Sequence, residues 1–141
     1  MPRGRRIAFD YGDVRIGVAV CDLDAILASP LLTLRTSDKK LAAQLLQIFE
    51  DYRPIRIFVG KPANMDGSLG EAADKCQRFC ELLQTLTDVP VVSIDERLTT
   101  VSAWKKFHEA GLQAKAAKSR IDQMAAVAIL EFGLAFEKNQ E

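Results

Sequence analysis

The stretch IAFDYGDVRIGVAV, residues Ile7–Val20, combines two strand signals with one carboxylate in an unexpected place. Two apolar runs flank Gly12 and Asp13, and glycine followed by aspartate is an accepted two-residue hairpin turn. The stretch therefore predicts two antiparallel core strands, the first of which ends at Asp10. Because an unmatched buried polar group costs roughly 2–7 kcal/mol, Asp10 requires a partner, a metal ion or a hydrogen-bond network.

Outward from this hairpin, the apolar residues change between strand and helix periodicity several times. Ser37 or Asp38 is the expected cap of the first helix, and Pro54 follows its end. Strand Val89–Ile94 is expected to end in Asp95-Glu96. The expected strands cover residues 5–11, 15–21, 31–35, 55–59 and 89–94, and the expected helices run over 41–52, from 69 or 71 to 87, from 99 or 100 to 111, and over 121–137.

The order β-β-β-α-β-α-β-α-α predicts an α/β fold with a mixed five-stranded sheet and helices on both faces. This is the layout of the ribonuclease H-like fold, whereas a flavodoxin-like fold would begin with β-α. A length of 141 residues predicts one domain over 1–141. The chain has 19 basic and 19 acidic residues, so its net charge does not indicate a strongly basic nucleic-acid binder. The clustering of basic residues on the surface matters more for such binding than the net charge.

The cysteine count and the hydropathy indicate a cytoplasmic protein that does not enter a membrane. The three cysteines are an odd number, no signal peptide precedes them, and no apolar run approaches about 18 residues. Cys76 and Cys80 lie four residues apart on a helix, without a histidine or second cysteine pair, so we expect them in the core. The single histidine, His108, lies on an amphipathic helix and is not expected to be catalytic.

Carboxylates stand at the ends of elements that are expected to meet. Asp10 ends the first strand, Asp95 and Glu96 end the last strand, and Asp122 opens the final helix beside small alanines. Strand alternation allows only one residue of the Asp95-Glu96 pair to face Asp10. Converging carboxylates repel one another, and Mg²⁺ or Mn²⁺ would resolve the repulsion, two such ions being suited to phosphodiester displacement.

Each carboxylate also has a purely structural interpretation. Asp10 could cap a turn with its side chain. Asp95 could form a surface ion pair with Arg97, two residues along the chain. Asp122 could be an acidic residue favoured by the positive N-terminal end of a helix.

The motifs FDYGDVRIGVAVCD, VGKPANMDGS, DERLTT and KSRIDQMAAVAIL, in this order, resemble the YqgF/RuvX family of bacterial Holliday-junction resolvases and ribosomal RNA processing nucleases. The resemblance implies a ribonuclease H-like fold and metal dependence. It also implies that Asp10, Glu96 and Asp122 are the catalytic, metal-binding residues, and that Asp95 supports them without being a direct ligand. Val14 and Lys61 depart from the family pattern, in which a basic and an aliphatic residue are common, so contacts to nucleic acid could differ there.

Contacts to nucleic acid should come from backbone amides and basic side chains. Arg97 could bind a phosphate or orient Glu96, and Thr99 and Thr100 lie at an expected helix N-terminus, where phosphate binds readily. The polar loop at 62–68 is expected to face substrate. Its expected contacts are Lys61 and Asn64, and a basic rim would comprise Arg3, Arg5, Arg6, Lys105, Lys106, Lys115, Lys118 and Arg120.

The resulting expectation is a Mg²⁺- or Mn²⁺-dependent nuclease that processes the 5′ end of pre-16S rRNA in ribosome biogenesis. Alternatives are a resolvase of branched DNA, which would need two active sites and hence a homodimer rather than a monomer, and a non-catalytic ribosome-assembly factor that binds nucleic acid. Nucleotide binding of the actin and sugar-kinase type ranks last, because 141 residues supply one lobe of the two required.

Overall fold

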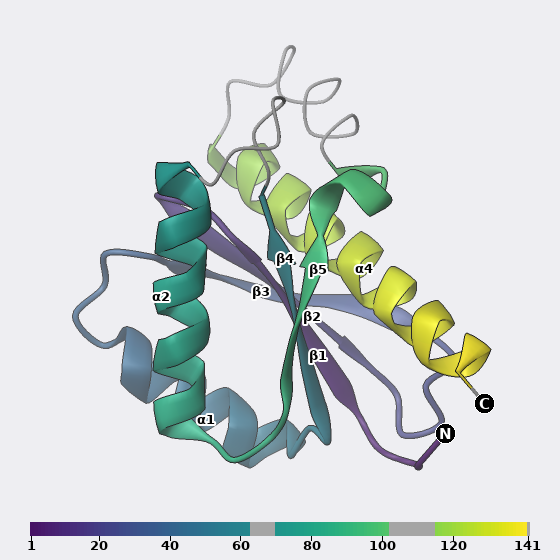
Figure 1. Cartoon of the computed structure of the whole chain (residues 1–141). Coiled ribbons are helices and arrows are strands. Elements are labelled where there is room, and N and C mark those ends of the chain that lie inside the picture. Colours follow the sequence, from purple (N-terminus) through teal and green to yellow (C-terminus); the bar gives the residue numbers. More distant parts are fainter. Residues whose placement is uncertain (63–69, 102–114, 141) are drawn as a thin grey trace.

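The computed structural model describes residues 1–62, 70–101 and 115–140, and the side chains of 115–117 lie outside that description. Figure 1 shows a sheet with helices on both faces, as the element order predicted. The strands are β1 (Arg6–Tyr11), β2 (Arg15–Cys21), β3 (Ala28–Arg35), β4 (Arg56–Lys61) and β5 (Val91–Asp95); the helices are α1 (Leu41–Tyr52), α2 (Glu71–Leu86), the 3-10 turn η1 (Glu96–Leu98) and α4 (Lys115–Asn139).

The sheet is mixed, with strand order β3-β2-β1-β4-β5. β1 pairs antiparallel with β2, and β2 pairs antiparallel with β3. β4 is parallel to both β1 and β5, so the carboxyl ends of β1, β4 and β5 share one edge of the sheet. Both chain ends lie at the opposite end of the molecule, as Figure 1 shows. The predicted mixed five-stranded sheet is thus confirmed.

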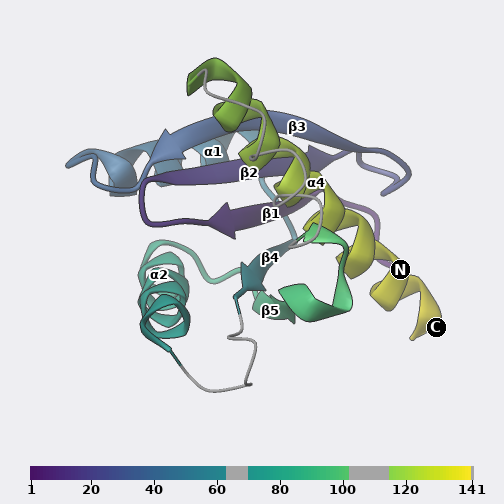
Figure 2. The ribbon, with the colours of Figure 1, turned by 90° about the horizontal axis from the view of Figure 1, so that it is seen from above.

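Each face of the sheet carries its own core. On one face, α1 and α2 pack against alternate strand residues, and on the other face α4 packs against the sheet (Figure 2). Phe9 and Ile57 belong to the first core, whereas their strand neighbours Ala8 and Phe58 belong to the second. Cys76 and Cys80 are buried in the first core, as expected. Strand alternation therefore decides which helix each strand residue meets.

Several boundaries differ from the predicted ones. The strands leave three residues, 12–14, between β1 and β2, and the last pair of the hairpin is Tyr11 with Ile16, so the connection is longer than the predicted two-residue turn. The first helix is capped at Lys40, and the Asp38 carboxylate accepts a hydrogen bond from the Lys40 amide in the preceding turn. β3 begins three residues before Leu31. α4 begins at Lys115, so Asp122 lies inside this helix and not at its start, and the helix-terminus interpretation of Asp122 is wrong.

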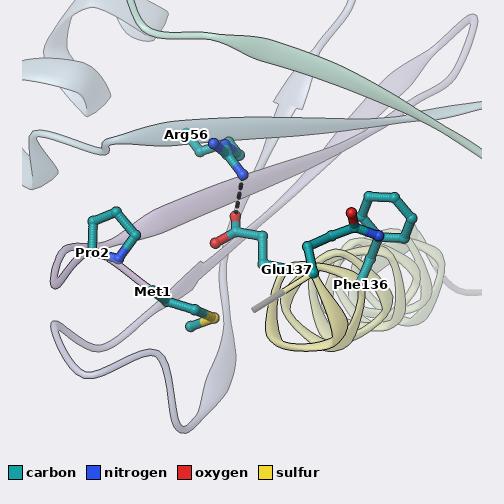
Figure 3. A pocket seen from close by; sticks show the side chains of 6 residues that line it. Met1, Pro2, Arg56, Phe136 and Glu137 are labelled. Atoms are coloured by element: carbon teal, nitrogen blue, oxygen red, sulfur yellow. Dashed lines mark ion pairs between the residues drawn. The ribbon is translucent and has the colours of Figure 1, made fainter.

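The far end of α4 is joined to the sheet by a buried ion-pair network. Arg6 is 1% exposed; its Nη2 lies 2.8 Å from Glu137 Oε2, and its Nη1 donates to the carbonyl of Gly4 at 2.7 Å. Arg56 reaches Glu137 Oε1 at 3.1 Å, at the edge of a pocket that Met1, Pro2 and Phe136 also line (Figure 3). Among the described residues that line this pocket, the one carboxylate, Glu137, is thus ion-paired, and the pocket lies at the end of the sheet remote from Asp10.

No helix in the described part of the chain combines the length and the apolar character that crossing a membrane requires.

Candidate active site

Asp10 lies at the centre of one row of paired residues that crosses the sheet. Gly17 on β2 and Gly60 on β4 are its direct partners, and Thr33 and Ile94 continue the row outward. Asp10 shares the strand face of Ala8, which packs against α4, and it is 1% exposed. A glycine on each side leaves the space beside the carboxylate free of strand side chains.

Gly60 gives space to the carboxylate of Glu96. β5 ends at Asp95, and Glu96 begins the turn η1 that follows. A Cβ atom on Gly60 would lie 3.3 Å from Glu96 Oε1, so the carboxylate lies over Gly60, one strand away from Asp10. Neighbouring strands are about 4.8 Å apart, so the two carboxylates are neighbours. Glu96 is 8% exposed, which shows that the chain buries two acidic groups side by side.

Gly17 gives space to helix α4 on the other side of Asp10. A Cβ atom on Gly17 would overlap the backbone carbonyl of Asp122, so only glycine permits this approach. Next along the row, Thr33 Oγ1 donates to the Ser119 carbonyl at 3.1 Å and accepts from Gln123 Nε2 at 3.0 Å. These contacts hold the backbone of Asp122 against the strand that pairs with β1.

The Asp122 side chain is bound by an arginine. Arg15 Nε donates to Asp122 Oδ2 at 2.6 Å, and the two side chains are 24% and 9% exposed. Arg15 precedes Gly17 by two residues, so both lie on the α4 face of β2. This role of Arg15 was not predicted from the sequence, although alternation from Gly17 and the predicted approach of the last helix to the sheet could have indicated it.

The structure thus brings the predicted carboxylates to one face and one edge of the sheet, but not into a three-ligand metal site. Among the described residues, no three histidine, cysteine, aspartate or glutamate side chains are grouped closely enough to hold a metal ion. Asp10 and Glu96 alone fit a cation such as Mg²⁺, which commonly takes one or two carboxylates together with water and substrate phosphate. Asp122 is directed to Arg15 instead.

Asp95 and Arg97 form the local pair that the structural interpretation predicted. Arg97 Nη2 lies 2.7 Å from Asp95 Oδ2, and the Asp95 side chain also accepts from the Arg97 amide at 2.9 Å. Hydrogen bonds from Arg97 lower the pKa of Asp95, and Asp95 in turn raises the pKa of Arg97. Arg97 therefore orients Asp95, and the expectation that it orients Glu96 is wrong.

The predicted substrate contacts are spread around this edge. Lys61 pairs in register with Asp95 at the end of β4, and alternation places both on the α2 face, away from Asp10. Thr99 Oγ1 donates to the Glu96 carbonyl at 2.8 Å and so fixes the turn that carries Glu96. Thr100 is exposed. Asn64 lies outside the described residues.

The described members of the predicted basic rim lie at two different ends of the sheet. Arg6 is buried against Glu137, and Arg3 pairs with Asp24, both at the end of the sheet remote from Asp10. Lys118 is half-buried and Arg120 exposed near the active-site end of α4. The remaining rim lysines, Lys105, Lys106 and the side chain of Lys115, lie outside the described residues, as does His108.

Comparison with known proteins places this arrangement in a family. A Streptomyces coelicolor protein named "Putative pre-16S rRNA nuclease" is 46% identical over 140 residues, which are 98% of this chain and 84% of the relative. A Cutibacterium acnes protein of the same name is 42% identical over 129 residues, 91% of this chain and 80% of the relative.

Among solved structures, a chain of "T. thermophilus RuvC in complex with Holliday junction substrate" has a TM-score of 0.61 at 18% identity, with 95% of this chain and 96% of that chain covered. A second chain, "Thermus thermophilus RuvC structure", has a TM-score of 0.58 at 19% identity and covers 96% of each. At these identities the likeness shows the fold. The model of the RuvX family, described as Holliday junction resolvase, matches residues 4–135, and the chain therefore belongs to this family.

Proposed function

We propose that this chain is a nuclease that hydrolyses phosphodiester bonds at the edge of the sheet where Asp10 lies. One observation carries the proposal: the two direct partners of Asp10 in the sheet are glycines, and the space they leave admits Glu96 on one side and Asp122 on the other. Burial of several acidic groups around one position is costly unless a cation compensates it. The family membership and the names of the relatives point to the same chemistry.

We assign Asp10 and Glu96 as the residues that would hold one or two divalent cations, Mg²⁺ or Mn²⁺, and Asp122 as the further ligand. When bound, such a cation stabilises the charge that develops on the phosphate and lowers the pKa of a bound water. The chain's own residues position the donors. β1 and η1 present Asp10 and Glu96 from rigid elements, and Thr99 holds the turn that carries Glu96.

The proposed substrate is the precursor of 16S rRNA, cleaved during maturation of its 5′ end in ribosome biogenesis. The names of the relatives in Streptomyces coelicolor and Cutibacterium acnes support this substrate. Branched DNA is the second candidate, because the family that matches is described as Holliday junction resolvase. Resolution of a symmetric junction requires two active sites, so this alternative also predicts a homodimer, whereas RNA processing is compatible with a monomer.

The deciding experiment incubates purified protein with a pre-16S rRNA fragment and, separately, with a four-way DNA junction, each with Mg²⁺, Mn²⁺ or EDTA. We expect cleavage of the RNA that requires the metal and disappears in Asp10→Asn. Cleavage of the junction alone would identify the resolvase activity. Metal-independent binding of either nucleic acid without cleavage would overturn the nuclease proposal in favour of an assembly factor.

A further inference from the structure

The ion pair between Arg15 and Asp122 raises a question for the proposed function, on which the following inference rests. A carboxylate that should serve a cation is bound at 2.6 Å by a guanidinium, which is itself a cation. A metal ion and Arg15 would compete for the same carboxylate, and their like charges would repel at this short range. In the structure, the Asp122 carboxylate is bound by Arg15.

The backbone geometry makes this pairing the default. α4 lies directly on Gly17, and Thr33 is hydrogen-bonded to both Ser119 and Gln123, so the helix is fixed on β2 at this point. Arg15 lies two residues before Gly17 on the same face of the strand, so its guanidinium reaches Asp122. The pairing therefore needs no rearrangement of the backbone to form or to open, only rotation of two side chains.

Arg15 is also placed to bind a second anion. Its Nε is used by Asp122, whereas a guanidinium has further N–H donors in a planar fork that suits phosphate. The side chain is 24% exposed, so part of it is open to an approaching anion. Arg35 is the direct cross-strand partner of Arg15 and is exposed. Like charges opposite one another are unfavourable, and an anion placed between them would relieve the repulsion.

We propose that Arg15 is a positioning residue that holds Asp122 until a backbone phosphate of the nucleic acid takes its guanidinium, which then releases Asp122 to the divalent cation. Exchange of one anionic partner for another leaves the charge of Arg15 compensated throughout. Cation binding and substrate binding are thereby coupled, and by linkage each strengthens the other. The full ligand set would be completed only on the substrate complex.

The test measures Mn²⁺ affinity by calorimetry or electron paramagnetic resonance, with no nucleic acid present. Arg15→Gln should raise the affinity about tenfold, since Asp122 is then available, which corresponds to about 1.4 kcal/mol. Arg97→Gln is the matched control, because it removes an arginine from another carboxylate at the same edge but leaves Asp122 bound; we expect less than a twofold change. Arg15→Lys keeps the positive charge but lacks the planar guanidinium, so its Mn²⁺ affinity should lie between those of wild type and Arg15→Gln.

Asp122→Asn supplies the decisive background. If Arg15 acts through Asp122, Arg15→Gln should no longer raise Mn²⁺ affinity when residue 122 is asparagine. An unchanged or lower affinity in the single variant would overturn the proposal, and so would a gain that persists in the Asp122→Asn background, because that gain would reflect general electrostatics. Thermal melts confirm that each variant is folded.

The second arm measures binding of the pre-16S rRNA fragment in EDTA across a salt series. Arg15→Gln should flatten the dependence of log affinity on log salt by about one phosphate contact, a slope change of roughly 0.7 on a single strand. An unchanged slope would overturn the phosphate role of Arg15. Failure of the nuclease proposal itself appears elsewhere, as absence of metal-dependent cleavage in wild-type protein, so the two failures are distinguishable.

Discussion

Helix α4 is joined to the sheet by an ion pair near each end, and the two pairs differ in what surrounds them. At the remote end, Arg6 is 1% exposed and directs Nε, Nη1 and Nη2 to Glu137 and to the Gly4 carbonyl. At the active-site end, Arg15 is 24% exposed and contacts Asp122 through Nε. The first arginine is enclosed by the chain, with hydrogen bonds from all three of its guanidinium nitrogens, whereas about a quarter of the second side chain is open to solvent.

This difference separates a structural ion pair from a functional one. A fully buried pair must be satisfied internally, because each unpaired charge or donor costs several kcal/mol. A part-buried pair is solvated when it opens, so it can exchange partners at low cost. Burial of the cation, more than the distance between the charged atoms, is therefore the feature that distinguishes the two ends of α4.

The largest expected effect is on activity at the active-site end. Asp10→Asn keeps the size of the side chain but removes the charge of a proposed metal ligand, so cleavage should fall by a factor on the order of 1,000, or about 4 kcal/mol of transition-state stabilisation. The melting temperature should hold or rise, because repulsion from Glu96 is relieved. Cleavage at the wild-type rate would exclude Asp10 as a ligand.

At the remote end, the effect should be on stability instead. Arg6→Met leaves Glu137 buried with the more exposed Arg56 as its remaining partner, so the free energy of unfolding should fall by roughly 3–5 kcal/mol. Urea denaturation measures this loss. The double variant Arg6→Met/Glu137→Leu is the control, because removal of both charges should restore much of the stability. If Arg6→Met lowered the free energy of unfolding by less than about 1 kcal/mol, the Arg6 network would contribute no more to stability than the Arg15 ion pair does.

The two acidic residues after β5 should respond unequally. Glu96→Gln removes a carboxylate that lies over Gly60 beside Asp10, so cleavage should be lost. Asp95 lies on the opposite face and pairs with Arg97, so Asp95→Asn should reduce activity less than tenfold. Steady-state cleavage assays with both variants give the ranking, and the reverse order would contradict the assignment of Glu96 as ligand.

Substitution of Arg15 or Arg97, the two arginines at this edge, should lower the free energy of unfolding by smaller and unequal amounts. Arg15→Gln removes a part-buried pair between distant elements and should lower the free energy of unfolding by about 1 kcal/mol, between the values typical of exposed and buried pairs. Arg97→Gln removes an exposed local pair and should cost less than about 0.5 kcal/mol. Equal losses in urea titrations would remove the distinction between them.

The smallest effect concerns pH. The hydrogen bonds from Arg97 lower the pKa of Asp95 in the folded state, so this carboxylate adds stability above its unfolded pKa and loses it as the pH falls through the folded pKa. Arg97→Gln should raise the pKa of Asp95 toward its ordinary value, which a carboxyl titration by NMR would detect. Because Arg97 is exposed, the change in acid stability should be only just measurable. No movement of the Asp95 pKa would contradict the assigned cause.

Prediction from the sequence succeeded where local pattern was sufficient. The apolar runs on either side of Gly12 and Asp13 predicted β1 and β2 as core strands, and helical spacing predicted α1 and α2 almost to the residue. The position of Asp10 near the end of a core strand singled out that carboxylate. Alternation allowed only one of Asp95 and Glu96 to face Asp10, and the family resemblance selected Glu96. The pattern singled out Asp122 at the expected start of the last helix, whereas the structure places it inside α4.

Local pattern predicted the strands, most of the helices and the positions where a carboxylate would be costly, because periodicity and burial are properties of neighbouring residues. It could not predict the partners of Asp122 or Arg6, since residues 15 and 122, or 6 and 137, meet only when α4 crosses the sheet. Gly17 permits that crossing by the absence of a side chain. Which arginine is buried and which stays partly exposed therefore depends on the packing of the whole chain.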